Sequence, residues 1–402
     1  MKIKNNLMKK SFVIIIVLNI LSIFNILFFC VDLLPQIIEK INKPNYLSST
    51  NNNQVESKLV QASFEMFSST KMHMPWARPN NFIDKIRALR LDETTRIYNF
   101  PRAYLALGLI KYGNKFDSTL VQKVIPVFDD YYLNGEELAF KFEYVDQVPL
   151  GFAALELYKI TGNSKYKKMA NIIYGKLRTM VTKHGKYSII LYRDHQDDLF
   201  VDAIGMVCPF LMEYGLQFKN REAIQLAESE LEFFMTYGLD GKDALPFHAI
   251  DLKLEKGLGP NNWGRGMGWY MLALESVMSN LNSELDTVMF MEQNKLSFLK
   301  NIKNLKDSTL YTEFPGTSKG FDSSTSTMLM YGSNVLEPGT YTIDSILTIF
   351  KPFIKENGIL DRCSGDAFGV DKYSLEFGES ELSQGMILML LSTTSSNKAL
   401  TR

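Results

Sequence analysis

Apolar residues recur at helical spacing along most of the chain, whereas strand-like alternation of apolar and polar residues is rare. Alternation is confined to residues 186–192 and 308–314. The helical spacing predicts helices around Val60–Phe67 and over 102–112, 120–132, 147–161, 164–183, 196–215, 219–237, 265–281, 285–303, 323–335, 341–354 and 379–392. Because helices dominate so strongly, the pattern predicts an all-α fold.

The number and spacing of these helices favour a toroid of helical hairpins. An α-solenoid is the alternative, but the sequence shows no repeat of fixed period. Four glycines, Gly113, Gly162, Gly215 and Gly238, stand where predicted helices end, as is typical of helix C-termini. In a closed toroid the inner-helix N-termini and the longer loops meet at one end, so we expect the functional site there.

The N-terminus has the pattern of a membrane anchor or a signal segment. Four lysines within residues 1–10 precede the segment 11–31, whose apolar run from Phe12 to Phe29 is at the short end of what spans a bilayer. The charge distribution predicts that the remainder of the chain lies outside the cytoplasm. No small-residue cleavage site follows, which favours an uncleaved anchor over a secreted product. Residues 42–57 are Asn/Ser-rich, which predicts a linker over 32–57, followed by one large domain over 58–402.

Composition narrows the classes of partner. The 402 residues contain 44 basic and 44 acidic side chains, so there is no basic footprint for nucleic acid. The three cysteines and four histidines show no paired spacing typical of a metal site. We therefore expect no nucleic-acid partner and no metal ion.

A glycine-rich segment, Asn261–Tyr270, precedes an apolar helix. Its three glycines alternate with Trp263, Arg265, Met267 and Trp269. It is not a dinucleotide-binding loop, because Trp269 occupies the place of the third glycine. The indoles and the guanidinium suit a sugar ring that carries a carboxylate. The alternative is a tight packing contact with buried tryptophans, and the segment alone does not decide between the two.

Asp202 is the first candidate acid. It lies within Leu199–Met212, which is apolar on every face and therefore predicts a buried inner helix. Desolvation there would raise the pKa of Asp202 and let it donate a proton near neutral pH. The alternative is a structural carboxylate bonded to backbone N–H groups.

Two further residues are candidates with equally plain structural alternatives. Asp146 precedes a helix that has Pro149 in its first turn, so it is either an N-cap or a second carboxylate of a glycoside-cleaving pair. His248 comes shortly before the glycine-rich segment, and it is either a structural or a catalytic histidine.

The glycine-rich segment resembles a known signature. Trp263–Tyr270 is similar to the W-x-R-G-N-G-W-Y motif of unsaturated glucuronyl and rhamnogalacturonyl hydrolases, glycoside hydrolase families 88 and 105. Other segments resemble these families in the same order along residues 60–395: Asp146–Gly162, Leu199–Leu211, Phe247–Asp251 and Asp322–Met328.

The resemblance implies an (α/α)6 barrel that acts on unsaturated uronide oligosaccharides. Polysaccharide lyases leave a C4=C5 double bond on the terminal uronic acid of such substrates. By resemblance, Asp202 protonates C4 and then accepts a proton from the water that attacks C5. Asp146 positions the substrate or shares the proton transfer. The chemistry implied needs no metal or organic cofactor.

The resemblance also implies binding roles. Trp263 and Trp269 would stack on the sugar ring, while Arg265 and His248 would bind near the uronate or the water. Met267 departs from the motif, because it replaces an asparagine. Two alternatives therefore stay open: a carbohydrate-binding toroid that has lost turnover, and another helical-toroid enzyme such as a lyase.

Overall fold

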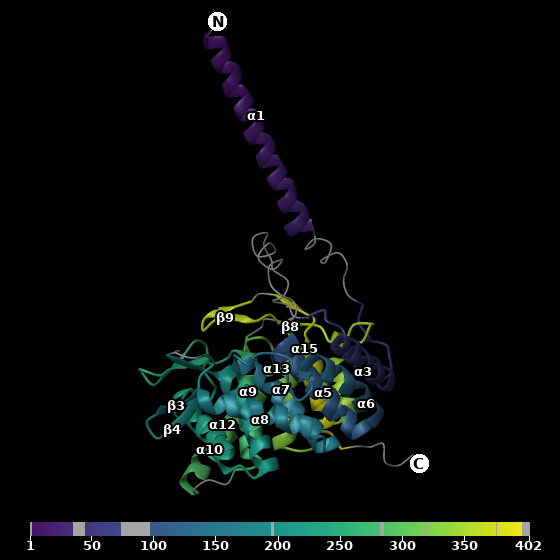
Figure 1. Ribbon diagram of the computed structural model, residues 1–402, viewed down its shortest axis with the longest axis vertical. Helices are drawn as coiled ribbons and strands as arrows, with labels where there is room; N and C mark the ends of the chain where they lie inside the picture. Colours follow the sequence, from purple (N-terminus) through teal and green to yellow (C-terminus); the bar gives the residue numbers. More distant parts are fainter. Residues whose placement is uncertain are drawn as a thin grey trace. The chain divides into compact units, whose positions relative to one another are not determined.

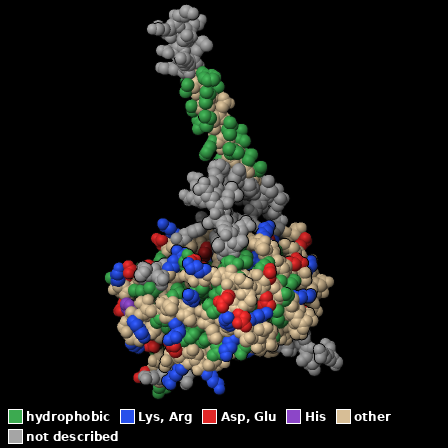
Figure 2. Space-filling model, viewed as in Figure 1, with side chains coloured by type: hydrophobic (Ala, Val, Ile, Leu, Met, Phe, Trp, Pro, Cys, Tyr) green, Lys and Arg blue, Asp and Glu red, His purple; other side chains and the backbone are tan. Residues whose placement is uncertain are grey.

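The computed structural model describes residues 2–34, 45–73, 97–193, 197–281, 285–317, 320–374 and 376–395. The N-terminal unit contains α1 (Lys2–Phe28), which continues into a π-helical turn, η1 (Phe29–Leu33). Apolar side chains between Phe12 and Phe29 are exposed, and Figure 2 shows them along the helix. No helix of the described residues combines the length and apolar character needed to cross a bilayer. The membrane segment expected over 11–31 is thus unsupported and stays a prediction.

The second unit consists of inner helices that pack in a ring and outer helices that cover them. Figure 1 shows this unit as a body of closely packed helices. In the described chain the inner helices are α5 (Phe100–Phe116), α7 (Val148–Thr161), α9 (Val201–Phe218), α11 (Gly264–Met278), α13 (Ser323–Leu336) and α15 (Glu381–Ser392). Each packs against the next, and α15 packs against α5, so the ring is closed. Apolar residues on nearly every face of these helices explain their burial.

The outer helices alternate with the inner ones along the chain. They are α3 (Asn52–Ser68), α6 (Ser118–Tyr132), α8 (Ser164–Met180), α10 (Arg221–Tyr237), α12 (Leu285–Asn304) and α14 (Ile343–Phe350). They carry one buried face and one exposed polar face, as expected for helices that cover a core. The predicted toroid of helical hairpins is confirmed. Helix α14 is shorter than predicted because Pro352 lies in the 3-10 turn, η5 (Lys351–Phe353), that follows it.

Of the four glycines predicted to mark helix C-termini, two do so and two lie inside helices. Gly162 follows α7 with a left-handed φ of 67°, and Gly238 follows α10. Gly113 and Gly215 instead lie inside α5 and α9. A Cβ on Gly215 would come within 2.5 Å of the Ile224 side chain on α10. These two glycines therefore permit close packing of a hairpin rather than ending a helix.

Short strands connect the helices at the ends of the toroid. They are β1 (Leu133–Asn134), β2 (Glu137–Leu138), β3 (Val181–His184), β4 (Tyr187–Ile190), β5 (Asp198–Phe200), β6 (Ala249–Asp251), β7 (Lys256–Leu258), β8 (Cys363–Ser364), β9 (Ala367–Gly369), β10 (Lys372–Tyr373) and β11 (Phe377–Gly378). The strand predicted over 186–192 is confirmed as β4, whereas 308–314 forms only isolated bridges.

The antiparallel sheet β5–β6–β7 contributes most directly to the site. Leu199 pairs with Ile250, and the Val201 N–H donates to the His248 carbonyl at 2.9 Å. The helix predicted from residue 196 therefore starts later, because its first residues belong to β5. This pairing holds His248 beside the first turn of α9.

The domain begins earlier than the predicted boundary at residue 58. Tyr46 pairs with Lys355, and α3 already starts at Asn52. The side chain of Asn51 caps α3 by accepting from the Gln54 N–H at 2.9 Å. The polar segment predicted as a linker up to residue 57 therefore contains the N-cap of α3.

The ring closes where two glycines face each other. A Cβ on Gly108 of α5 would lie 2.2 Å from the Gly385 carbonyl oxygen. A Cβ on Gly385 of α15 would lie 2.2 Å from the Tyr104 carbonyl oxygen. The backbones of the first and last inner helices are therefore in direct contact, which side chains at these positions would prevent.

We expect Gly385→Ala to lower the free energy of unfolding by about 1–3 kcal/mol, because the added methyl group overlaps the α5 backbone. Gly175→Ala is the matched control, because it lies inside α8 and its Cβ meets no atom within 4 Å. The control should be neutral or stabilising by up to about 1 kcal/mol. Chemical denaturation measures both variants, and equal stabilities would contradict the closure contact.

Candidate active site

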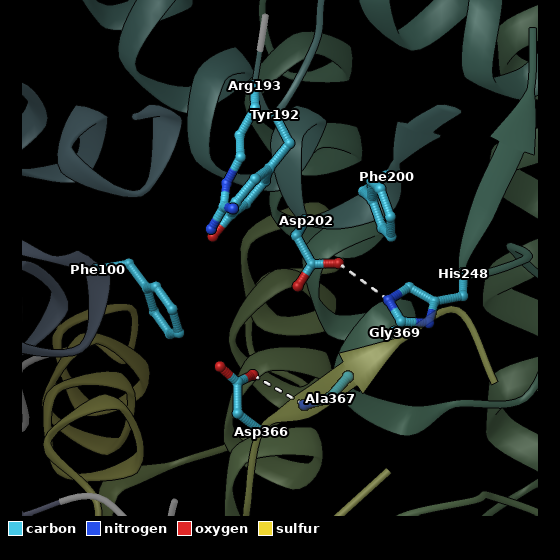
Figure 3. Close-up of a pocket in the computed structure, with 9 residues that line it drawn as sticks. All are labelled: Phe100, Tyr192, Arg193, Phe200, Asp202, His248, Asp366, Ala367 and Gly369. Atoms are coloured by element: carbon cyan, nitrogen blue, oxygen red, sulfur yellow. Dashed lines mark hydrogen bonds and ion pairs between the residues drawn. The ribbon is translucent and has the colours of Figure 1, made fainter. Parts of the chain in front are cut away.

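A pocket of about 300 Å³ lies where the N-terminal ends of inner helices meet the sheet and the loop after β8. Figure 3 shows the described residues that line it: Phe100, Tyr192, Arg193, Phe200, Asp202, His248, Asp366, Ala367 and Gly369. The prediction of a site at this end of the toroid therefore agrees with the pocket. Among the described residues, no cluster of three His, Cys, Asp or Glu side chains is placed to hold a metal ion.

Asp202 stands in the first turn of α9 and faces the pocket. Its side chain is 17% exposed, and its Oδ2 atom lies 3.6 Å from Nε2 of His248. Within the described chain this buried oxygen has no hydrogen-bond partner. A purely structural carboxylate would be bonded there, so the contact favours a functional role for Asp202.

His248 is held in one orientation by the loop that follows β9. Its Nδ1 lies 3.1 Å from the Val370 carbonyl oxygen and 2.8 Å from the Tyr373 hydroxyl. Because Tyr373 donates its own hydrogen to the Val370 carbonyl, Nδ1 of His248 must carry the hydrogen in these contacts. The Nε2 atom of the ring therefore faces Asp202. This pair can exchange a proton.

Asp146 lies in the 3-10 turn η4 (Val145–Gln147), outside the described lining of the pocket, but its carboxyl group interacts with the lining residues Arg193, Tyr192 and Asp366. It does not cap α7, whose N-cap is the last residue of that turn, so the capping interpretation is wrong. Burial raises the pKa of Asp146 to about 6, against the opposing effects of its backbone N–H, Arg193 and Tyr192, while Asp366 raises it further. Asp146 can therefore keep a proton close to neutral pH.

The two tryptophans of the glycine-rich segment do not line the pocket. Trp269 is fully buried against Phe100, with ring centroids 5.4 Å apart. Trp263 is 1% exposed and packs behind His248, with ring centroids 4.3 Å apart. With no free face for a sugar ring, their predicted stacking roles are not supported. Of the two interpretations left open for this segment, the structure favours tight packing.

Arg265 is also buried behind the pocket wall. Its Nη1 donates to the Ser364 carbonyl at 2.8 Å, and its Nη2 donates to the Gly365 carbonyl at 2.5 Å. The guanidinium fork is thus engaged with backbone oxygens, and the side chain is only 1% exposed. A direct contact between Arg265 and a uronate is not supported by this geometry. Among the described lining residues, the arginine is Arg193.

Sequence reasoning missed most of the remaining wall. Phe200 and Tyr192 provide aromatic surface next to His248, where the tryptophans were expected. Asp366, in the turn between β8 and β9, faces the pocket as a third acid. Burial raises the pKa of Asp366; Arg265 opposes this rise and Asp202 adds to it. No periodicity distinguishes these residues, because their loops are irregular.

The fold and the pocket together define a class of protein. Glycoside-cleaving enzymes act through carboxyl groups that face one cavity, and this toroid has such groups at one end. The family model described as Glycosyl Hydrolase Family 88 matches residues 85–334, more than half of the chain. The chain belongs to this family. The resemblance seen in the sequence, and the assignment as an unsaturated glucuronyl hydrolase-like glycoside hydrolase, are confirmed.

Solved structures agree on the fold. A family 105 glycoside hydrolase from C. acetobutylicum has a TM-score of 0.61 and 18% identity, covering 77% of this chain and 96% of its own. A possible family 105 member from Klebsiella pneumoniae has a TM-score of 0.67 and 12% identity, covering 88% and 96%. A family 88 hydrolase from Bacteroides vulgatus has a TM-score of 0.55 and 16% identity, covering 77% and 95%.

The pKa of Asp146 predicts a dependence of stability on pH. Because the folded pKa of about 6 exceeds the ordinary value of 3.8, the folded state keeps a proton that the unfolded state loses as pH rises between them. Stability should fall over that window, by about 3 kcal/mol at most, and stay lower above it. Asp146→Asn should remove this loss, so the variant should be more stable than wild type near neutral pH.

Urea denaturation at both ends of this pH window measures the effect. Asp130→Asn, an exposed position on α6, is the control and should track wild type at both pH values. A stability gap between wild type and Asp146→Asn that does not widen from acid to neutral pH would refute the assignment.

Proposed function

We propose that this enzyme hydrates the C4=C5 double bond of a terminal unsaturated uronic acid and so releases the sugar attached to it. The observation that carries the proposal is the pair of Asp202 and His248, 3.6 Å apart in the pocket, with Asp146 able to keep a proton beside it. Proton donation to carbon and proton removal from water both need such groups.

The reaction follows from the groups that face the pocket. Protonated Asp202 gives its proton to C4, and positive charge develops at C5 and the ring oxygen. Water attacks C5, and the Asp202 carboxylate takes the proton that the water loses. The hemiketal formed at C5 then opens by breaking its bond to the ring oxygen, which leaves a ketone at C5 and a hemiacetal at C1. Collapse of this hemiacetal to an aldehyde breaks the bond from C1 to the linking oxygen and releases the attached sugar, which takes the hemiacetal proton. His248 offers Nε2 to hold or pass on the proton, and Asp146 donates a hydrogen bond that positions the substrate.

Arg193 is the side chain that best fits the uronate carboxylate. It lines the pocket on the side of Tyr192, and its charge acts on Asp146. A guanidinium can hold a carboxylate with two hydrogen bonds, which fixes the ring as well as its charge. This assigns to Arg193 the role that the sequence suggested for Arg265.

The alternatives are weaker but testable. Met267, the departure that favoured a non-catalytic binding protein, is fully buried and does not line the pocket. Met267 in place of the motif's asparagine therefore removes no polar group from the described pocket wall. A lyase has one specific observation in its favour, because Tyr192 and Arg193 stand together as a possible base and neutraliser.

We also infer that the N-terminal segment holds the enzyme at a membrane, with the catalytic domain outside the cytoplasm. Support comes from the four lysines within residues 1–10 and from the exposed apolar side chains between Phe12 and Phe29. Full-length chain should sediment with membranes until detergent is added, whereas a chain that starts at Tyr46 should not. Full-length protein that stays in the supernatant would count against the inference.

The central prediction concerns Asp202. Asp202→Asn should lower kcat by about 10²–10⁴-fold, because the amide neither gives the proton to C4 nor takes one from water. The measurement is the loss of alkene ultraviolet absorbance with a panel of lyase-generated unsaturated disaccharides.

Asp198→Asn is the matched control, because this acid lies in β5 just before Asp202 and does not line the pocket. It should keep wild-type turnover.

Arg193→Gln should raise KM more than it lowers kcat. Absorbance that rises with an intact polysaccharide would indicate a lyase, and saturable binding without turnover would indicate a binding protein.

A further inference from the structure

Asp366 occupies the pocket wall across from Asp202, in the turn that joins β8 to β9. Figure 3 shows the two carboxylates on different sides of the cavity, with Arg193 at a third position above them. Asp366 is far in sequence from Asp146 in η4 and Asp202 in α9, and the reaction described above gives it no part. Its side chain is 35% exposed, so it is open to a ligand.

The backbone just before Asp366 is held by two buried side chains, Arg265 and Asp322. Arg265 donates to the carbonyl oxygens of Ser364 and Gly365. Asp322, which is fully buried, accepts from the Ser364 N–H at 3.0 Å and from its hydroxyl at 2.9 Å. A rigid support of this kind is what positions a binding group accurately, because a group that has little freedom to lose binds its ligand at lower entropic cost.

The side chain of Asp366 is oriented as well. Its Oδ1 accepts from the Ala367 N–H at 3.0 Å and lies 3.5 Å from Nη2 of Arg265. Among the described residues, the hydrogen bonds and the ion pair to this carboxylate all involve its Oδ1 atom. Figure 3 shows the second oxygen turned away from Ala367, toward the side of the cavity where Phe100 lies. One oxygen therefore fixes the side chain, and the other is presented to a ligand.

We propose that Asp366 is a specificity-determining residue that accepts a hydrogen bond from a ring hydroxyl of the substrate. The inference rests on the proposed function. An unsaturated uronic acid keeps hydroxyls on C2 and C3, and an ionised carboxylate binds hydroxyls as an acceptor. The same carboxylate repels the uronate charge, which directs that group toward Arg193. Asp366 and Arg193 together fix which way the ring enters the pocket, and hence which carbon faces Asp202.

The test compares wild type with Asp366→Ala on an unsaturated disaccharide and on its 2-deoxy and 3-deoxy analogues. Wild type should lose about 10- to 100-fold in kcat/KM on one of the two analogues, because a hydrogen bond to a charged group is lost. Asp366→Ala should show a similar loss on the parent substrate, mostly in KM. It should then turn over the parent and that analogue at nearly equal kcat/KM.

Two further variants keep the result interpretable. Asp371→Asn, an exposed acid in the turn between β9 and β10, is the control and should discriminate between the substrates as wild type does. Asp366→Asn keeps an oxygen for the Ala367 N–H. If Asp366→Ala has a lower melting temperature than wild type, Asp366→Asn is compared with wild type on the same three substrates, and that comparison tests the role of Asp366.

The outcomes separate the two proposals. If wild type turns over the substrates, and Asp366→Ala discriminates between the parent disaccharide and its deoxy analogues as wild type does, the role of Asp366 is overturned. The proposed function then still stands. If wild type binds without turnover, the proposed function fails, and calorimetry with the same three sugars tests Asp366 alone. Wild type that neither binds nor turns over any of them overturns both.

Discussion

The direct contact between α5 and α15 at Gly108 and Gly385 is the constraint on which the rest of the domain depends. Because outer helices alternate with inner ones, closure of the inner ring makes all the inner helices run in the same direction. Their N-termini then meet at one end, where the backbone N–H groups and the helix dipoles favour negative charge. The acids of α9 and of the turn before α7 lie at that end, so closure of the ring also assembles the pocket.

A pocket rich in acids has to receive a substrate that is itself an anion. Two features of the site reconcile these charges. Burial raises the pKa of Asp146 to about 6, so this side chain stays protonated at pH values where an ordinary carboxyl group is ionised. Arg193 adds positive charge on one wall, away from Asp366. The result is an uneven field across a small cavity, which orients a charged ring before any chemistry occurs.

The glycine-rich signature illustrates how a motif that marks a family can act through structure. Trp263 supports His248 from behind, and Arg265 holds the backbone next to Asp366. Neither side chain belongs to the described lining of the pocket, yet each fixes a residue that does. A substitution in this motif would therefore change activity by moving His248 or Asp366.

The sequence by itself determined the helices and the toroid, and it singled out Asp146 and Asp202 as candidate acids. Periodicity predicts which face of a helix is buried, and an isolated acid such as Asp202 in an apolar run is conspicuous wherever it packs. Only the tertiary structure decided which side chains face the cavity. A buried core and a pocket wall have the same apolar pattern, so Trp269 could not be told apart from Phe200. Asp366 lies across the pocket from Asp202 only because the ring closes, and no local spacing in the sequence records that two segments so far apart share one cavity.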